Sequence, residues 1–196
     1  YLETDGSYFW MAPKVLRFSG SYLASSRLPR ALQPTLDRLA ARTAEAFSAV
    51  VLDGDQVVIV ARSGPTRMLA YGLHLGARLP AHATSTGRVL LAAKPKAEFN
   101  AWLKGRELPR LTAHTVNDTK QLRQVIDQVR QQDWCVASEE HELGVHAAAV
   151  PLRNLEGRVV AALNVVTRLE RVRPPVLGRE VLPLLHDAAR ELRALL

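Results

Sequence analysis

Cysteine is nearly absent from this chain, which holds a single thiol, Cys135, among 196 residues. One cysteine excludes a disulfide framework and a cysteine-rich zinc site, and it suits a reducing cytoplasm. Glycine and proline number only 11 each and are scattered, which excludes a fibrous or disordered chain. Long apolar runs are missing too: the longest, at 159–166, is interrupted by Asn164 and has the length of one strand. We therefore expect a cytoplasmic protein without a membrane partner.

Positive charge is present but is not concentrated. The net charge of +7 comes from 26 lysines and arginines against 19 acidic residues. The densest basic group, at 168–179, is diluted by Glu170. A surface that binds phosphates usually gathers its basic residues in one stripe, so we expect no direct nucleic-acid surface here. The remaining composition, 47% hydrophobic and 23% charged, is that of one soluble globular domain.

The first 26 residues have a pattern of their own. Asp5-Gly6 between two short extended pieces predicts a hairpin, which by itself is marginal in water. We interpret residues 1–11 as the remnant of a preceding domain. Pro13 then begins an amphipathic helix within residues 12–26, and a second helix begins near residue 28.

Strand patterns joined by hairpins dominate the rest. Apolar runs at 47–52 and 57–61 flank residues 53–55, Asp-Gly-Asp, which predict a tight hairpin. Further strands are expected at 68–71, 134–137, 145–152 and 159–166. Helices are predicted to begin near Thr84, Pro95, Thr119 and Pro174. Because hairpins outnumber strand–helix–strand units, the order favours an α+β fold, an antiparallel sheet flanked by helices. The last two strands are apolar on both faces, as is typical of central strands.

Motifs for catalysis or metal binding are weak. Cys135 lies in a strand-like run, where a buried, inert thiol is expected. His141 and His146 are five residues apart, about 140° around a helix, so they do not form a zinc-protease pair. No Gly-x-Ser-x-Gly elbow surrounds Ser85, and no glycine spacing matches a phosphate or dinucleotide loop. We expect no catalysis, no metal and no cofactor.

Three features indicate ligand binding instead. Residues 84–87, Thr-Ser-Thr-Gly, would place hydroxyls and free N–H groups at a helix N-terminus, where they could bind a carboxylate or only cap the helix. Arg62 follows an apolar strand and could hold a carboxylate bidentately or end in solvent. Asn164 is the one amide in its apolar run. If it points inward it needs a partner, either a ligand or the backbone.

Three blocks of the sequence resemble the IclR family of bacterial transcription regulators. They are LPAHATSTGRVLLA at 79–92, EHELGV at 140–145 followed by AAVPL at 148–152, and VAALNV at 160–165. In this order they extend the resemblance over the chain from about Tyr8 onward. The segments FWMAPKVL at 9–16 and VARS at 60–63 are most similar to regulators of protocatechuate, 4-hydroxybenzoate and β-ketoadipate catabolism.

The resemblance implies a domain order. Members of the family have an N-terminal winged helix-turn-helix that binds DNA, a linker helix, and a GAF-like C-terminal domain that binds an effector. By this comparison residues 1–11 are the end of the wing, residues 12–26 the linker helix, and residues 27–196 the GAF-like domain. DNA would bind through a domain outside this sequence, and the protein would form a homodimer or homotetramer.

The resemblance also implies a pocket between the sheet and the helix near Thr84, which would hold a small aromatic or dicarboxylic acid. The matching family positions are Ser85, Thr86, Ala147 and Asn164, and some members have cysteine at the position of Ala147. From chemistry alone we add Arg62, His82 and His146. Two alternatives stay open: a GAF-like module that binds a cyclic nucleotide or haem, or a hydrolase built on Ser85 or Cys135.

Overall fold

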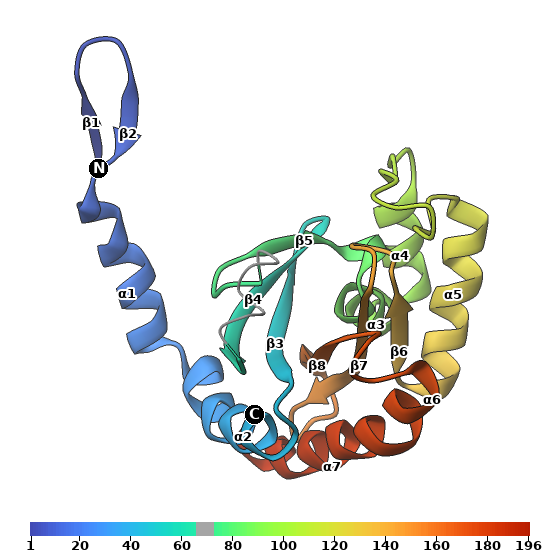
Figure 1. Ribbon diagram of the computed structural model, residues 1–196. Helices are drawn as coiled ribbons and strands as arrows, with labels where there is room; N and C mark the ends of the chain where they lie inside the picture. The colour runs from blue at the N-terminus through green and yellow to red at the C-terminus, as the bar shows by residue number, and fades with distance from the viewer. Residues whose placement is uncertain (66–72) are drawn as a thin grey trace.

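The centre of the molecule is a six-stranded antiparallel sheet (Figure 1), seen in a computed structural model that describes residues 1–65 and 73–196. The strand order is β5-β4-β3-β8-β7-β6. The strands are β3 (Ala46–Asp53), β4 (Gln56–Ser63), β5 (Arg78–Pro80), β6 (Cys135–Ser138), β7 (Val145–Arg153) and β8 (Val159–Arg168). The predicted α+β class is confirmed, whereas the strand expected at 68–71 lies outside the described residues.

Helices cover both faces of this sheet (Figure 1). One face packs against α2 (Arg27–Thr43) and α7 (Leu182–Leu192), and we call it the α2/α7 face. The other, the α3 face, lies against η3 (Ala81–Ala83), α3 (Ser85–Ala93), α4 (Lys96–Leu103) and α5 (Thr119–Gln132). The single helix predicted after Pro174 is in fact divided into α6 (Pro174–Val176), a π-helical turn η4 (Leu177–Val181), α7 and η5 (Arg193–Leu195).

The two central hairpin strands supply both cores. Successive side chains of a strand point to opposite faces. Ala148 of β7 therefore packs with Leu185 on the α2/α7 face, while its neighbour Ala149 packs with Ile126 of α5 on the α3 face. This confirms that the runs that are apolar on both faces are central strands covered on each side.

The start of α3 is set by two residues. The Thr84 hydroxyl accepts a hydrogen bond from the Gly87 backbone N–H at 3.2 Å and so caps the helix. A Cβ added to Gly87 would lie 2.1 Å from the carbonyl oxygen of Ala81, so only glycine allows η3 to pack this closely on α3. In α5 the cap is Asp118 rather than the predicted Thr119, because its carboxylate accepts from the Gln121 N–H at 2.8 Å.

The N-terminal residues form an arm that extends away from the sheet (Figure 1). The predicted hairpin is β1 (Leu2–Thr4) and β2 (Phe9–Met11), and the predicted helix is η1 (Pro13–Val15) with α1 (Leu16–Ser25). Large apolar side chains are exposed along the arm: Tyr1, Leu2, Tyr8, Phe9, Trp10, Met11, Leu16, Phe18 and Tyr22.

Candidate functional site

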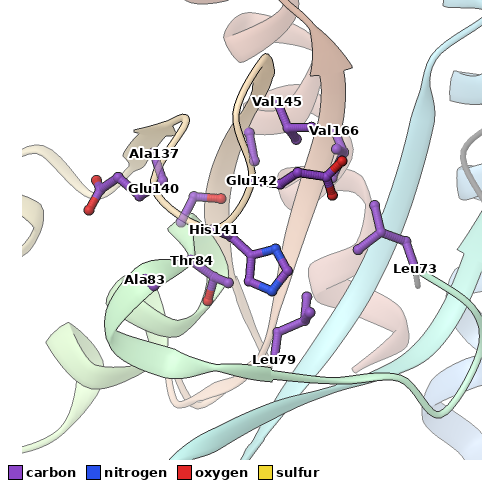
Figure 2. A pocket seen from close by; sticks show the side chains of 12 residues that line it. Leu73, Leu79, Ala83, Thr84, Ala137, Glu140, His141, Glu142, Val145 and Val166 are labelled. Atoms are coloured by element: carbon purple, nitrogen blue, oxygen red, sulfur yellow. The ribbon is translucent and has the colours of Figure 1, made fainter. Parts of the chain in front are cut away.

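A cavity lies on the α3 face between the sheet, the N-terminus of α3 and the turn at 139–144 that joins β6 to β7 (Figure 2). Its empty volume is about 470 Å³ with its opening to solvent included, a size suited to a small molecule. Leu73, Leu79 and Val145 contribute apolar walls. The cavity therefore offers a largely hydrophobic environment to whatever binds there.

Small side chains form the floor of the cavity. Ala137, Ala147 and Val166 lie directly opposite one another on β6, β7 and β8. All three point to the α3 face because they share one row of the pleated sheet. Larger residues in this row would fill the space, so the cavity depends on a run of short side chains.

The next row on the same face is polar. Asn164 of β8 lies opposite Ser48 of β3, and Ser48 lies opposite Arg62 of β4. Side chains opposite one another in an antiparallel pair are about 5 Å apart at Cβ, so the three form a continuous strip. Among the described residues, Asn164 Oδ1 and the Nε and Nη2 atoms of Arg62 are buried without a hydrogen-bond partner. Burial also lowers the pKa of the Arg62 guanidinium below its ordinary value.

Ser85, the first residue of α3, is a fully buried polar residue of the cavity lining. It is 1% exposed, and its Oγ has no hydrogen-bond partner among the described residues. The hydroxyl of neighbouring Thr84 is occupied, since it caps α3 and donates to Pro80 O at 3.2 Å. A buried polar atom without a partner costs about 1–3 kcal/mol, and a ligand that supplies one removes that cost. The helix N-terminus favours an anionic ligand.

The opposite wall is the turn at 139–144, which a buried ion pair holds in place. Arg88 of α3 is 2% exposed and forms a bidentate pair with the Glu140 carboxylate. The same carboxylate accepts from Val116 N–H at 3.0 Å, and Thr115 Oγ donates to Glu140 O at 2.6 Å. Figure 2 shows the Glu140 carboxylate turned away from the cavity centre. Glu140 thus anchors the wall rather than facing a ligand.

His141 projects its imidazole into the cavity, toward Thr84 and Leu79 (Figure 2). Burial lowers the pKa of this imidazole, and the nearby Glu142 carboxylate partly opposes that effect. No hydrogen bond joins the ring to the described part of the chain. At neutral pH the ring is therefore uncharged and can form a hydrogen bond with a ligand.

Four of the residues predicted from the sequence lie on this face. Ser85 and Ala147 line the cavity, and Asn164 and Arg62 belong to the adjacent polar strip. Thr86 is buried in the first turn of α3 but is not among the residues that line the cavity.

The two histidines predicted from chemistry lie elsewhere. His146 is two residues before Ala148 on β7 and so points to the α2/α7 face, where its Nδ1 is 2.6 Å from Ser138 Oγ. His82 lines a separate hollow beside Trp102, and its Nε2 donates to Pro109 O at 3.0 Å. Both lie outside the cavity lining, because the face of a strand residue and the direction of a loop residue depend on packing.

His141 and Glu140 are the residues that sequence reasoning missed. Both belong to the EHELGV block at 140–145, whose sequence resembles a zinc motif and a family signature but does not by itself indicate a cavity wall. Within the described ranges, 1–65 and 73–196, no three His, Cys, Asp or Glu side chains gather as a metal site would require. The block builds a wall of the cavity instead.

The surroundings of Cys135 and Ser85 do not favour a hydrolase built on either residue. Burial raises the pKa of the Cys135 thiol to about 11, so it stays protonated and poorly nucleophilic at neutral pH. No histidine is hydrogen-bonded to Ser85 Oγ among the described residues, so the hydroxyl has no base to activate it. None of the described helices is both long and apolar enough to cross a membrane.

The chain is similar in sequence to known regulatory proteins. The Pca operon regulatory protein of Acinetobacter baylyi is 46% identical over 200 residues, covering 100% of this chain and 72% of that protein. The p-hydroxybenzoate hydroxylase transcriptional activator of the same species is 48% identical over 200 residues, covering 100% of this chain and 74% of that protein. These relatives are transcription regulators rather than enzymes.

A solved structure extends the comparison to the fold. The PobR inducer-binding domain from Acinetobacter, a double mutant in complex with 3-hydroxybenzoic acid, matches with a TM-score of 0.81 at 46% identity. The match covers 86% of this chain and 98% of that one. The family model described as "Bacterial transcriptional regulator IclR C-terminal" matches residues 20–194. The chain therefore belongs to the IclR family of bacterial transcriptional regulators, and residues 20–194 form its C-terminal, effector-binding domain.

Proposed function

We propose that this domain senses a small aromatic carboxylic acid in the cavity on the α3 face and thereby controls transcription of a catabolic operon. One observation carries the proposal: Arg62, Ser85 and Asn164 keep buried polar atoms without partners on the same face as an apolar cavity. An aromatic acid has the complementary pair of features, an apolar ring and a carboxylate. A dicarboxylic acid would leave its second charge against the apolar walls, which is costly.

Each polar group has a defined task in this proposal. The Arg62 guanidinium pairs with the carboxylate, and Ser85 donates a hydrogen bond to it at the N-terminus of α3. The amide of Asn164 adds a further polar contact. The ring then lies over the small residues Ala147 and Val166, which leave room for it. The named ligand of the PobR domain, 3-hydroxybenzoic acid, is of this class.

Control of transcription follows from a shift in population. An effector that binds one arrangement of the cavity more tightly than another stabilises that arrangement by its difference in affinity.

In this proposal residues 1–11 are the end of a wing, residues 12–26 the linker helix, and residues 27–196 the sensing domain. The exposed apolar side chains of the arm support self-association into a homodimer or homotetramer. DNA would bind through an N-terminal domain, as in the family.

Isothermal titration calorimetry tests the proposal with 4-hydroxybenzoate, protocatechuate, terephthalate, β-ketoadipate, pyruvate and glyoxylate. We expect an aromatic acid to bind and Arg62→Ala to weaken it at least tenfold, because a charge-assisted hydrogen bond contributes about 1.5–3 kcal/mol. Ser85→Ala should weaken it less. Arg158→Ala, at an exposed position, is the matched control. Unchanged affinity in both site variants would show that the pocket is assigned wrongly.

A further inference from the structure

We propose that His141 is the residue that selects hydroxylated aromatic acids, because its imidazole forms a hydrogen bond with a hydroxyl on the effector's ring. This inference rests on the proposed function, since it takes the carboxylate to be bound by Arg62 and Ser85. Arg62 and Ser85 recognise only the carboxylate, so they do not distinguish acids that differ in their ring substituents. His141 would supply that distinction.

Among the described lining residues, the side chains of His141 and Glu142 are left to meet the rest of the ring, and only the neutral imidazole can both donate and accept a hydrogen bond. The Thr84 hydroxyl already caps α3 and donates to Pro80 O, and the Glu140 carboxylate is occupied by Arg88 and Val116 N–H. Ser85 is buried at the N-terminus of α3, where the carboxylate is proposed to bind. Of the side chains left, Figure 2 shows the His141 ring pointing into the cavity beside the apolar Leu79.

The backbone that carries the ring is held in place before any ligand binds. Residue 141 directly follows Glu140, whose carboxylate and carbonyl are held by Arg88 and Thr115. The other end of the turn is closed by Gly144 N–H, which donates to Glu139 Oε1 at 2.8 Å. A turn held at both ends loses little conformational freedom when a ligand binds, so the hydrogen bond to the imidazole can contribute fully to selectivity.

The chemistry of the imidazole suits a hydroxyl rather than a carboxylate. Because burial lowers its pKa, His141 is neutral at pH 7 and has one N–H donor and one acceptor nitrogen. A phenolic hydroxyl can donate to one ring nitrogen or accept from the other. A carboxylate prefers Arg62, whose positive charge compensates it. An unsubstituted ring would cover the imidazole and leave it without any partner, which lowers affinity.

The test compares dissociation constants for 4-hydroxybenzoate, 3-hydroxybenzoate and benzoate by titration calorimetry. We expect native protein to bind one of the hydroxybenzoates at least tenfold more tightly than benzoate. His141→Leu should reduce that ratio to nearly one while benzoate affinity stays within threefold of native. His141→Gln, which keeps a hydrogen-bonding group, should retain part of the preference. His114→Leu, at an exposed histidine outside the cavity, should behave like native protein.

Two results would overturn the inference while the proposed function stands. One is equal weakening of benzoate and the hydroxybenzoates by His141→Leu, which would show that His141 only supports the wall. The other is native protein that does not distinguish the ligands. Failure of every aromatic acid to bind native protein would refute the proposed function itself. A thermal melt of each variant identifies any that fail to fold, and His141→Gln then provides the comparison in place of His141→Leu.

Discussion

The two faces of the sheet are built from the same strands but packed in opposite ways. On the α2/α7 face, leucines from the helices fill the space above the strands without exposure to solvent, such as Leu36 of α2 over β3 and β4 and Leu185 of α7 over β7 and β8. On the α3 face, the strands present alanines, a polar strip and a cavity. Both faces have a hydrophobic core, but only the α3 face gives up part of its apolar contact around the candidate site.

The polar groups of the α3 face fall into two classes. Arg88 and Glu140 pair with each other and with nearby backbone groups, and they hold the cavity wall. Arg62, Ser85 and Asn164 are left with unpaired atoms that face the same side of the sheet. A buried group that is paired is structural, and one that is unpaired destabilises the free protein until a ligand binds. Four substitutions or conditions test this division, in order of decreasing effect.

The largest effect is expected for Arg88→Met. It leaves the buried Glu140 carboxylate without its cation, and removal of one partner of a buried pair typically costs about 3–5 kcal/mol. Urea denaturation measures the loss. The double variant Arg88→Met/Glu140→Leu should recover part of the stability, because no uncompensated charge remains. If the double variant is as unstable as the sum of the singles, the pair is not the source of the effect.

Leu185→Ala should destabilise the protein by about 2–5 kcal/mol, because it opens a cavity in the packed α2/α7 face. The same variant should bind the effector with native affinity, since Leu185 lies on the side of the sheet opposite the candidate site. Urea denaturation and calorimetry together check both expectations. A change in effector affinity of tenfold or more would mean that the two faces are coupled.

Ala147→Leu should have the opposite pattern, a loss of effector affinity with little change in stability. A leucine in the floor of the cavity occupies the space proposed for the ring, so effector affinity should fall at least tenfold. Stability should change by less than the roughly 1–3 kcal/mol typical of overpacking, because the side chain enters empty volume. The matched control is Ala148→Leu, one residue away but fully buried on the opposite face, where overpacking should destabilise without blocking the site.

The smallest effect is a loss of stability as the pH falls below 7. Burial lowers the pKa of His82, His141 and His146 in the folded protein below the ordinary value of 6.5. Through this range the unfolded chain binds more protons than the folded one, so the free energy of unfolding decreases as pH falls through 6.5. Thermal melts at pH 7.5, 6.5 and 5.5 measure this, and His141→Gln should reduce the slope.

The element order and part of the site could be predicted from local sequence. Period-two and helical patterns predicted the central hairpins and α3, and the lone amide in an apolar run singled out Asn164. Arg62 and Ser85 were predicted from residue type and position, and both keep unpaired buried atoms. The elements could be predicted because caps, turns and alternation are signals within a few residues, whereas the roles of Arg62, Ser85 and Asn164 stay predictions.

The predictions that failed needed information from distant parts of the chain. His146 was expected near the ligand, yet the register of β6, β7 and β8 points it to the α2/α7 face. A one-residue change in strand register would reverse that face, so residue type alone could not decide it. Likewise, the cap of α5 is Asp118 and the final helix contains a π-helical turn.

The sequence by itself determined the family, the α+β class and the small, polar and apolar positions from which a site could be made. Only the tertiary structure decided which of these residues contact one another and which line the cavity. It brings Arg88 to Glu140 across 52 positions of the chain, and that ion pair turns the Glu140 carboxylate outward and leaves His141 facing the cavity. The reason is physical: local patterns set helices, strands and turns, whereas side-chain partners are set by how those elements pack.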